Sequence, residues 1–179
     1  MYYYNDYNDY TDKNNVYSLD LYRAAMGADG PGPGNPFDPV AAFPEALRVI
    51  AQAVMGETED QLFYQYLIEQ APTDDEKTII KGIRDNEAKH YKMFRQIYFE
   101  LTGKNLPAPT ELAFEQPASY CEGLQKALMG EQNAVTKYRK ILYAMQNRRH
   151  INMMTEIITD ELRHLGLYNY LYARNGCRI

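Results

Sequence analysis

The sequence predicts an all-α protein, a four-helix bundle with a long crossover between its second and third helices, preceded by a disordered tail. Three observations lead to this prediction. Apolar residues recur at helical spacing from about residue 40 onward, and start and stop signals divide that region into four helices. One set of motifs occurs twice at a constant offset. We therefore expect a tail and linker over residues 1–39 and one domain over residues 40–179.

The first 39 residues offer few aliphatic side chains for a core. Seven tyrosines occur among residues 1–22, interspersed with Asn and Asp. This composition is typical of disordered segments. An alternative is that the tyrosines cross-link or transfer electrons when peroxide or oxygen is handled nearby. Residues 27–39 then contain four glycines and four prolines, so the folded domain should begin after them.

Local signals bound the first two helices. A first helix is expected over residues 40–70, where apolar side chains recur at steps of three and four. Pro72 ends it. Thr73 begins a Thr-Asp-Asp-Glu capping box, which predicts a second helix over residues 73–102 with Gly103 as its C-terminal stop.

A third helix is expected over residues 117–147, and a fourth from there to residue 174, where Asn175 and Gly176 form a C-cap. Short breaks make helices one and two, and likewise three and four, antiparallel neighbours. The connection over residues 104–116 could extend to about 46 Å, as long as a thirty-residue helix of about 45 Å. It can therefore run the length of the bundle and leave helices two and three parallel.

Two copies of one motif set fall near the middle of these helices. Met-Gly-Glu occurs at residues 55–57 and again at 129–131, and the glutamate of each copy lies thirty residues before that of a Glu-x-x-His. Every element of the second copy lies 74 residues after the first, which indicates an internal duplication. The acidic and histidine residues of the two copies are Glu57, Glu87, His90, Glu131, Glu161 and His164.

This residue set predicts a metal centre. In Glu-x-x-His the carboxylate and the imidazole project from one face of a helix toward the same point. Four carboxylates at mid-bundle would cost more than the stability margin of such a domain unless cations compensate them. Two divalent ions balance four carboxylates, and the mixture of carboxylate and imidazole suits iron or manganese.

In this pattern, residues 40–174 resemble the ferritin-like di-iron carboxylate superfamily, and most closely its rubrerythrins and bacterioferritins. The resemblance implies that the four glutamates are bridging and terminal ligands of two iron ions, with His90 and His164 terminal on one metal each. Bacterioferritins carry a haem-binding methionine at the position of Ala88, so no haem is expected. Rubrerythrins usually carry a further glutamate at the position of Ala134, and its absence disfavours their ligand-switching peroxidase mechanism.

The resemblance implies a rubrerythrin-like non-haem di-iron oxidoreductase that reduces hydrogen peroxide or dioxygen. The chain has no rubredoxin-like domain, so an external electron donor such as a rubredoxin-like protein is expected, and a homodimer is the expected assembly. A manganese catalase, a ferritin-like iron storage or buffering protein, and a non-catalytic helical protein that retains the fold are the alternatives.

Neighbours of the motif residues are candidates for supporting roles. Tyr64 and Tyr138 each follow a motif glutamate by seven residues and return to the same helix face, where they serve either the metal site or simple core packing. Asn86 and Asp160 precede the Glu-x-x-His glutamates, and similar proteins use such residues to accept a hydrogen bond from a ligand histidine. Each could serve its own histidine or the facing one.

The two copies also differ near the motif glutamates, which predicts one polar and one apolar side of the cluster. The differing pairs are Asp60 and Ala134, Gln61 and Val135, and Arg84 and Ile158.

The remaining features exclude other classes. A net charge of −5 disfavours binding to nucleic acid or a membrane surface. Neither a signal peptide nor a membrane-spanning segment is expected. Cys121 and Cys177 lie far apart and form no Cys-x-x-Cys, so we expect free thiols in a cytoplasmic protein and not a zinc site or a disulfide framework. His150 lacks any motif context, which predicts a surface position.

Overall fold

The structure is a computed structural model that describes residues 37–107 and 114–178, apart from the side chains of residues 57 and 58. Most of the predicted tail and linker lies outside these ranges. In the described part, the chain forms helices and no strands, which confirms the all-α class. None of its helices is long and apolar enough to cross a membrane. The helices are α2 (Pro39–Met55), α3 (Glu57–Gln70), α4 (Asp74–Thr102), α5 (Tyr120–Ala144) and α6 (Arg148–Arg174).

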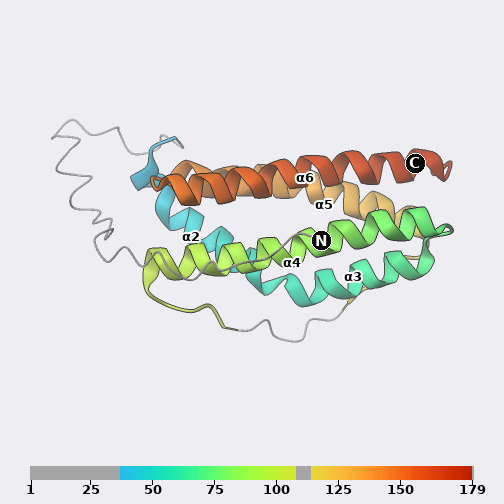
Figure 1. Cartoon of the computed structure of the whole chain (residues 1–179), viewed down its shortest axis with the longest axis horizontal. Coiled ribbons are helices and arrows are strands. Elements are labelled where there is room, and N and C mark those ends of the chain that lie inside the picture. The colour runs from blue at the N-terminus through green and yellow to red at the C-terminus, as the bar shows by residue number, and fades with distance from the viewer. Residues whose placement is uncertain (1–36, 108–113, 179) are drawn as a thin grey trace, which may run out of the picture. The chain divides into compact units, whose positions relative to one another are not determined.

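The helices follow the up-and-down order that the loop lengths predict (Figure 1). Helices α2 and α3 follow one another along the bundle, and α4 returns beside them. Helix α5 runs parallel to α4, and α6 returns antiparallel to α5. Helix α5 packs mainly on α6 and α2, so the crossover between α4 and α5 connects opposite ends of the bundle, as predicted.

The prediction of one continuous first helix over residues 40–70 is wrong, because Gly56 separates α2 from α3. The backbone hydrogen bonds still pass through this point, since the Gly56 N–H donates to the Gln52 carbonyl and the Asp60 N–H donates to the Gly56 carbonyl. The break is therefore a local kink at the residue with the lowest helix propensity apart from proline.

The helix ends of α4 follow the sequence signals. Thr73 accepts a hydrogen bond from the Glu76 N–H at 3.3 Å, and Gly103 ends the helix with a φ of 69°. The third helix starts later than predicted, at Tyr120, because Ser119 caps it by accepting from the Glu122 N–H at 3.1 Å. It ends at Ala144, three residues before the predicted end at 147.

The core consists of two apolar clusters, one on each side of the Glu-x-x-His turns. The first is built around Ile50, Phe94, Ile141 and Met154, and the second around Leu67, Ile80, Leu124 and Leu171, all of them buried. The residues between the clusters are the motif residues, so the bundle holds its polar side chains at mid-length between two packed ends.

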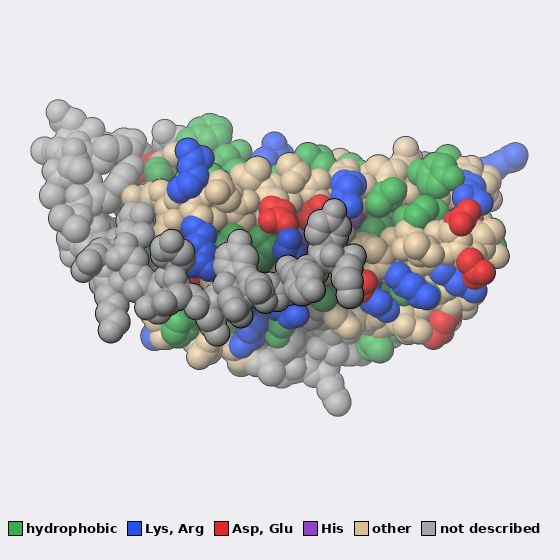
Figure 2. Space-filling view, in the orientation of Figure 1, with side chains coloured by type: hydrophobic (Ala, Val, Ile, Leu, Met, Phe, Trp, Pro, Cys, Tyr) green, Lys and Arg blue, Asp and Glu red, His purple; other side chains and the backbone are tan. Residues whose placement is uncertain are grey.

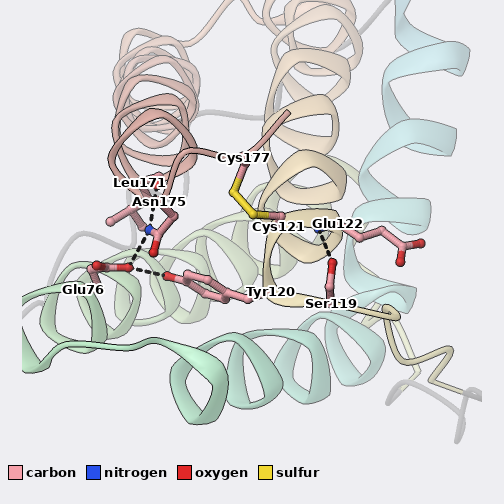
Figure 3. Close-up of a disulfide and its surroundings, with 8 residues drawn as sticks. All are labelled: Glu76, Ser119, Tyr120, Cys121, Glu122, Leu171, Asn175 and Cys177. Atoms are coloured by element: carbon pink, nitrogen blue, oxygen red, sulfur yellow. Dashed lines mark hydrogen bonds between the residues drawn. A yellow bond between two sulfur atoms is a disulfide. The ribbon is translucent and has the colours of Figure 1, made fainter. Parts of the chain in front are cut away.

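The two cysteines are not free thiols, which corrects the prediction from sequence. Cys121, in the first turn of α5, and Cys177, just beyond α6, form a disulfide with a Cα–Cα distance of 5.5 Å (Figure 3). Sequence spacing could not reveal this pair, because the bundle brings together residues that lie 56 positions apart. Beside the disulfide, buried Glu76 accepts hydrogen bonds from the Tyr120 hydroxyl at 3.0 Å and the Asn175 amide at 2.9 Å.

The prediction of a surface position for His150 is also wrong. The side chain is buried near the start of α6, and its Nε2 lies 2.6 Å from the Glu100 carboxylate on α4. Arg149 donates to the other oxygen of the same carboxylate at 3.0 Å. The contact with Glu100, fifty residues away in the sequence, therefore explains why this histidine is buried.

We expect Gly123→Ala to lower the free energy of unfolding by about 1–3 kcal/mol. A Cβ at this position would lie 2.7 Å from Leu67 Cδ2 and 3.4 Å from Tyr66 Cε1, both in buried side chains where α3 approaches α5. Gly82→Ala is the control, since its Cβ meets nothing within 4 Å, and it should raise stability by up to about 1 kcal/mol. Equal urea midpoints for the two variants would contradict this packing.

We expect reduction of the disulfide to lower the free energy of unfolding by about 4 kcal/mol, because the bond closes a long loop in the unfolded chain. The measurement is denaturant unfolding with and without a phosphine reductant. A Cys121→Ser, Cys177→Ser double variant should match the reduced protein and ignore the reductant. An unchanged midpoint after complete reduction would show that the bond contributes nothing to stability.

Candidate metal centre

Three helices bring the motif residues of the described part together. Glu87 and His90 lie one turn apart on α4, Glu161 and His164 lie one turn apart on α6, and Glu131 projects from α5. Ligand atoms of Glu87, Glu131, Glu161 and His164 all lie within 4.8 Å of one another. Such a group of carboxylates and an imidazole can hold a divalent metal ion.

One half of the cluster surrounds His90. Its Nδ1 lies 3.3 Å from Glu87 Oε2 and 3.3 Å from Glu161 Oε1. The two carboxylates thus approach the ring from α4 and α6, so a cation beside Nδ1 would meet an oxygen from each.

The other half surrounds His164 and uses the remaining oxygens of the same two carboxylates. Its Nδ1 lies 2.9 Å from Glu87 Oε1, 3.5 Å from Glu161 Oε2 and 3.8 Å from Glu131 Oε1. Glu87 and Glu161 therefore span both halves, which is the position of bridging ligands, whereas Glu131 faces one half only. The imidazole rings are 6.0 Å apart between centroids.

Glu57 is the counterpart of Glu131 in the repeat. The structure places it as the first residue of α3, directly after the kink at Gly56, but its side chain lies outside the described residues. Its role as a ligand of the His90 half remains a prediction from the sequence.

Burial makes this cluster unstable without a cation. The side chains of His90 and Glu161 are each 1% exposed and that of His164 is fully buried. Among the described residues, the buried side-chain atoms that make no hydrogen bond of good geometry are Glu87 Oε1, Glu161 Oε1, both ring nitrogens of His164 and the Tyr168 hydroxyl, although His164 Nδ1 lies 2.9 Å from Glu87 Oε1. All but the last belong to the cluster. Unpaired buried polar atoms cost free energy, so this donor set fits a metal pair.

Protons balance the charge when metal is absent. Burial opposes protonation of His90, but the carboxylates of Glu161 and Glu87 outweigh it and raise its pKa to about 10. His164 behaves likewise, with Glu131 and Glu161 raising its pKa to about 11. Burial raises the pKa of Glu131 to about 9, whereas the two histidines overcome burial and lower the pKa of Glu161. The metal-free site thus uses protonated histidines where a metal would supply the positive charge.

The two histidines have different partners on their outer nitrogens. Asp160 accepts from His90 Nε2 at 3.1 Å, so the residue preceding one Glu-x-x-His serves the facing histidine. Its counterpart Asn86 does not serve His164, because its side-chain oxygen accepts from Arg163 at 2.9 Å. Arg163 also donates to Asp160 at 2.8 Å and so ties the two residues together.

Tyr64 and Tyr138 are partly buried beside the cluster. Burial, followed by the charge of Glu87 for Tyr64 and of Glu161 for Tyr138, raises the pKa of each phenol well above its usual value. Both phenols therefore stay protonated. Tyr138 also packs on Phe94 with ring centroids 4.9 Å apart, which supports the core-packing alternative for this residue.

Tyr168 is a further residue beside the cluster, and it is not among those predicted from the sequence. It follows His164 by four residues, so helical spacing returns it to the same face, and this signal was available in the sequence. Its side chain is fully buried, and burial together with Glu131 and Glu87 raises its pKa. The corresponding residue in the first copy is Phe94, which has no hydroxyl group.

A cavity of about 350 Å³ leads to the cluster between α2, α3 and α5. Glu87, Glu131 and Glu161 line its inner part, and Asp60 and Ala134 line it as well. One pair of the differing neighbours, Asp60 and Ala134, thus lines the same opening. Arg84 instead pairs with Asp85 at 2.9 Å. On the face shown in Figure 2, basic and acidic side chains are interspersed with hydrophobic ones.

We expect Asp160→Asn to weaken metal binding by about 10–100-fold, because the carboxylate that orients His90 and increases its basicity is lost. Asn86→Ala is the control. It should change the affinity less, since Asn86 contacts Arg163 and neither ring nitrogen of His164. Competition with a fluorescent chelator measures both constants, and equal losses in the two variants would contradict the difference between the histidines.

Comparisons with known proteins agree with this geometry. No solved structure matches the chain significantly. The chain is 29% identical over 133 residues to "Uncharacterized protein YhjR" of Bacillus subtilis (strain 168), a match that covers 74% of this chain and 90% of that protein. The family model described as Rubrerythrin matches residues 48–172, which include every motif residue. The chain therefore belongs to the rubrerythrin family, within the ferritin-like di-iron superfamily.

Proposed function

We propose that this protein is a non-haem di-iron oxidoreductase that reduces hydrogen peroxide or dioxygen at the cluster between α4, α5 and α6. The observation that carries the proposal is the convergence of Glu87, Glu131, Glu161 and His164, whose ligand atoms all lie within 4.8 Å of one another. The bridging position of Glu87 and Glu161 supports a metal pair over a single ion.

Each side chain has a defined part in this proposal. His90 with Glu87 and Glu161 would hold one iron, and His164 with Glu131 and the same two carboxylates would hold the other. Glu57 completes the first half by the symmetry of the repeat. Bound irons supply redox and Lewis-acid chemistry for oxygen species. The protein positions them, and its cavity gives a small oxidant a path to the cluster.

Residues around the cluster can supply protons and hydrogen bonds to it. The protonated phenols of Tyr64 and Tyr138 lie beside the carboxylates and can donate a proton or a hydrogen bond as charge changes at the site. The two apolar clusters lie on either side of the motif residues along the bundle. An external electron donor is part of the proposal, as is a homodimeric assembly.

We expect wild-type protein loaded with ferrous iron under argon to hold two irons per chain by elemental analysis, and to consume peroxide faster than the metal-free protein. Glu131→Gln and Glu161→Gln should each hold fewer than one iron per chain, because each removes a charged ligand from the buried cluster. Glu156→Gln, an exposed change on the same helix as Glu161, is the control and should retain two.

The same experiments separate the alternatives. Selective retention of manganese with oxygen evolution from peroxide and no electron donor would indicate a manganese catalase. Uptake of many irons per chain into a large particle would indicate storage. Binding of less than one metal per wild-type chain, with no difference between the wild type and the glutamate variants, would disprove the metal site.

A further inference from the structure

A second redox group lies in the same chain. The disulfide between Cys121 and Cys177 closes the bundle at the end where α5 starts and α6 finishes (Figure 3). Both cysteines are partly exposed, so a reductant in solution can reach the bond. The fold holds the two residues together even though 56 positions separate them. A dithiol held together in this way closes readily and is therefore a good two-electron reductant.

The disulfide joins the start of α5 to the segment just beyond α6, and these two helices also carry part of the candidate metal centre. Ten residues separate Cys121 from Glu131 on α5, which corresponds to about 15 Å along the helix axis. The space between them is filled by the second apolar cluster, in which Tyr168 is buried and against which Tyr120 and Cys177 pack. The two redox groups are thus connected by packed side chains.

Tyr168 lies between the two groups. It lies one turn after His164 on α6, and it is part of the second apolar cluster, against which Tyr120 packs. Tyr120 directly precedes Cys121, and its hydroxyl donates a hydrogen bond to Glu76 at 3.0 Å. Two tyrosines therefore divide the span, and electron transfer in short steps is far faster than in one long step.

Tyr168 also has features that a purely structural tyrosine would not need. It is fully buried, its hydroxyl has no hydrogen-bond partner among the described residues, and the equivalent position in the first copy holds Phe94. A phenylalanine at 168 would avoid the cost of burying an unpaired hydroxyl. The retained hydroxyl points to a role for the phenol itself.

We propose that Cys121 and Cys177 form a redox-active dithiol that supplies electrons to the metal centre through Tyr120 and Tyr168. The inference rests on the proposed peroxide chemistry. The two thiols lose two electrons and two protons and form one S–S bond, while one hydrogen peroxide accepts them and becomes two water molecules. A dithiol reductant in solution then reopens the bond by exchange and closes the cycle. The dithiol is the immediate electron donor in this proposal.

The test measures how fast the two thiols form the disulfide. The protein is reduced with a phosphine under argon, freed of reductant, and either loaded with ferrous iron or left metal-free. Two equivalents of peroxide are added, because two ferrous ions and two thiols together hold four electrons. Alkylation with a maleimide at successive times, followed by mass spectrometry, counts the free thiols. Iron-loaded protein should form the disulfide at least tenfold faster than metal-free protein.

Two matched variants test the path. Tyr168→Phe should slow disulfide formation at least tenfold in iron-loaded protein, with its iron content unchanged. Tyr172→Phe, one turn further along α6 and packed against the same cluster, should behave as the wild type. Equal rates with and without iron, or equal rates for Tyr168→Phe and the wild type, would overturn the proposal.

The two proposals fail in different ways. If iron-loaded protein consumes one equivalent of peroxide rapidly and keeps both thiols, the di-iron function stands and the dithiol is only structural. If iron does not accelerate peroxide consumption, the di-iron function itself is wrong.

Discussion

The burial of negative charge at mid-bundle is the constraint on which the rest of the structure depends. Glu161 is 1% exposed and lies between two histidines that are equally buried. Carboxylates removed from water need positive charge nearby, and only protons or metal ions supply it here. Because the free energy involved is comparable to the whole stability margin of a domain, the helices must hold these groups within a fraction of an ångström of their partners. The apolar clusters on either side provide that rigidity.

The duplicated sequence explains the near symmetry of the site, and tertiary contacts explain where the symmetry ends. Both Glu-x-x-His motifs lie on continuous helices and supply carboxylates that span the two halves. The Met-Gly-Glu copies behave differently, because α5 continues through Gly130 whereas the first copy kinks at Gly56. Beyond the ligands, Asp160 orients His90, but Asn86 is engaged by Arg163 and leaves the outer nitrogen of His164 without a partner. Two metals bound there would have unequal surroundings.

The sequence predicted what depends on local spacing. The cap at Thr73 and the stop at Gly103 follow from signals within one helix, and the grouping of Glu87 with Glu161 and His164 follows from one spacing repeated on α4 and α6. Prediction from sequence failed for residues whose burial or oxidation depends on a partner that is distant in the chain. His150 is buried because of Glu100, and Cys121 is oxidised because of Cys177; in neither case does the local sequence show the partner. The predicted start of α5 at Pro117 was three residues too early, because Ser119 forms the N-cap of this helix.

The difference between local spacing and distant partners also applies to the tyrosines and cysteines of the chain. Residues that follow a motif by helical spacing, such as Tyr64, Tyr138 and Tyr168, reach the cluster by local geometry, and Tyr168 is also part of the apolar cluster against which Tyr120 packs beside the disulfide. The first copy has phenylalanine at the equivalent position, and no cysteine pair closes its end of the bundle in the described part. Within the described part, the tyrosine and the disulfide thus occur in one copy of the repeat and not in the other. A feature confined to one half of a symmetric site is not needed to hold two metals, so its explanation must lie in electron supply or in the stability of that end.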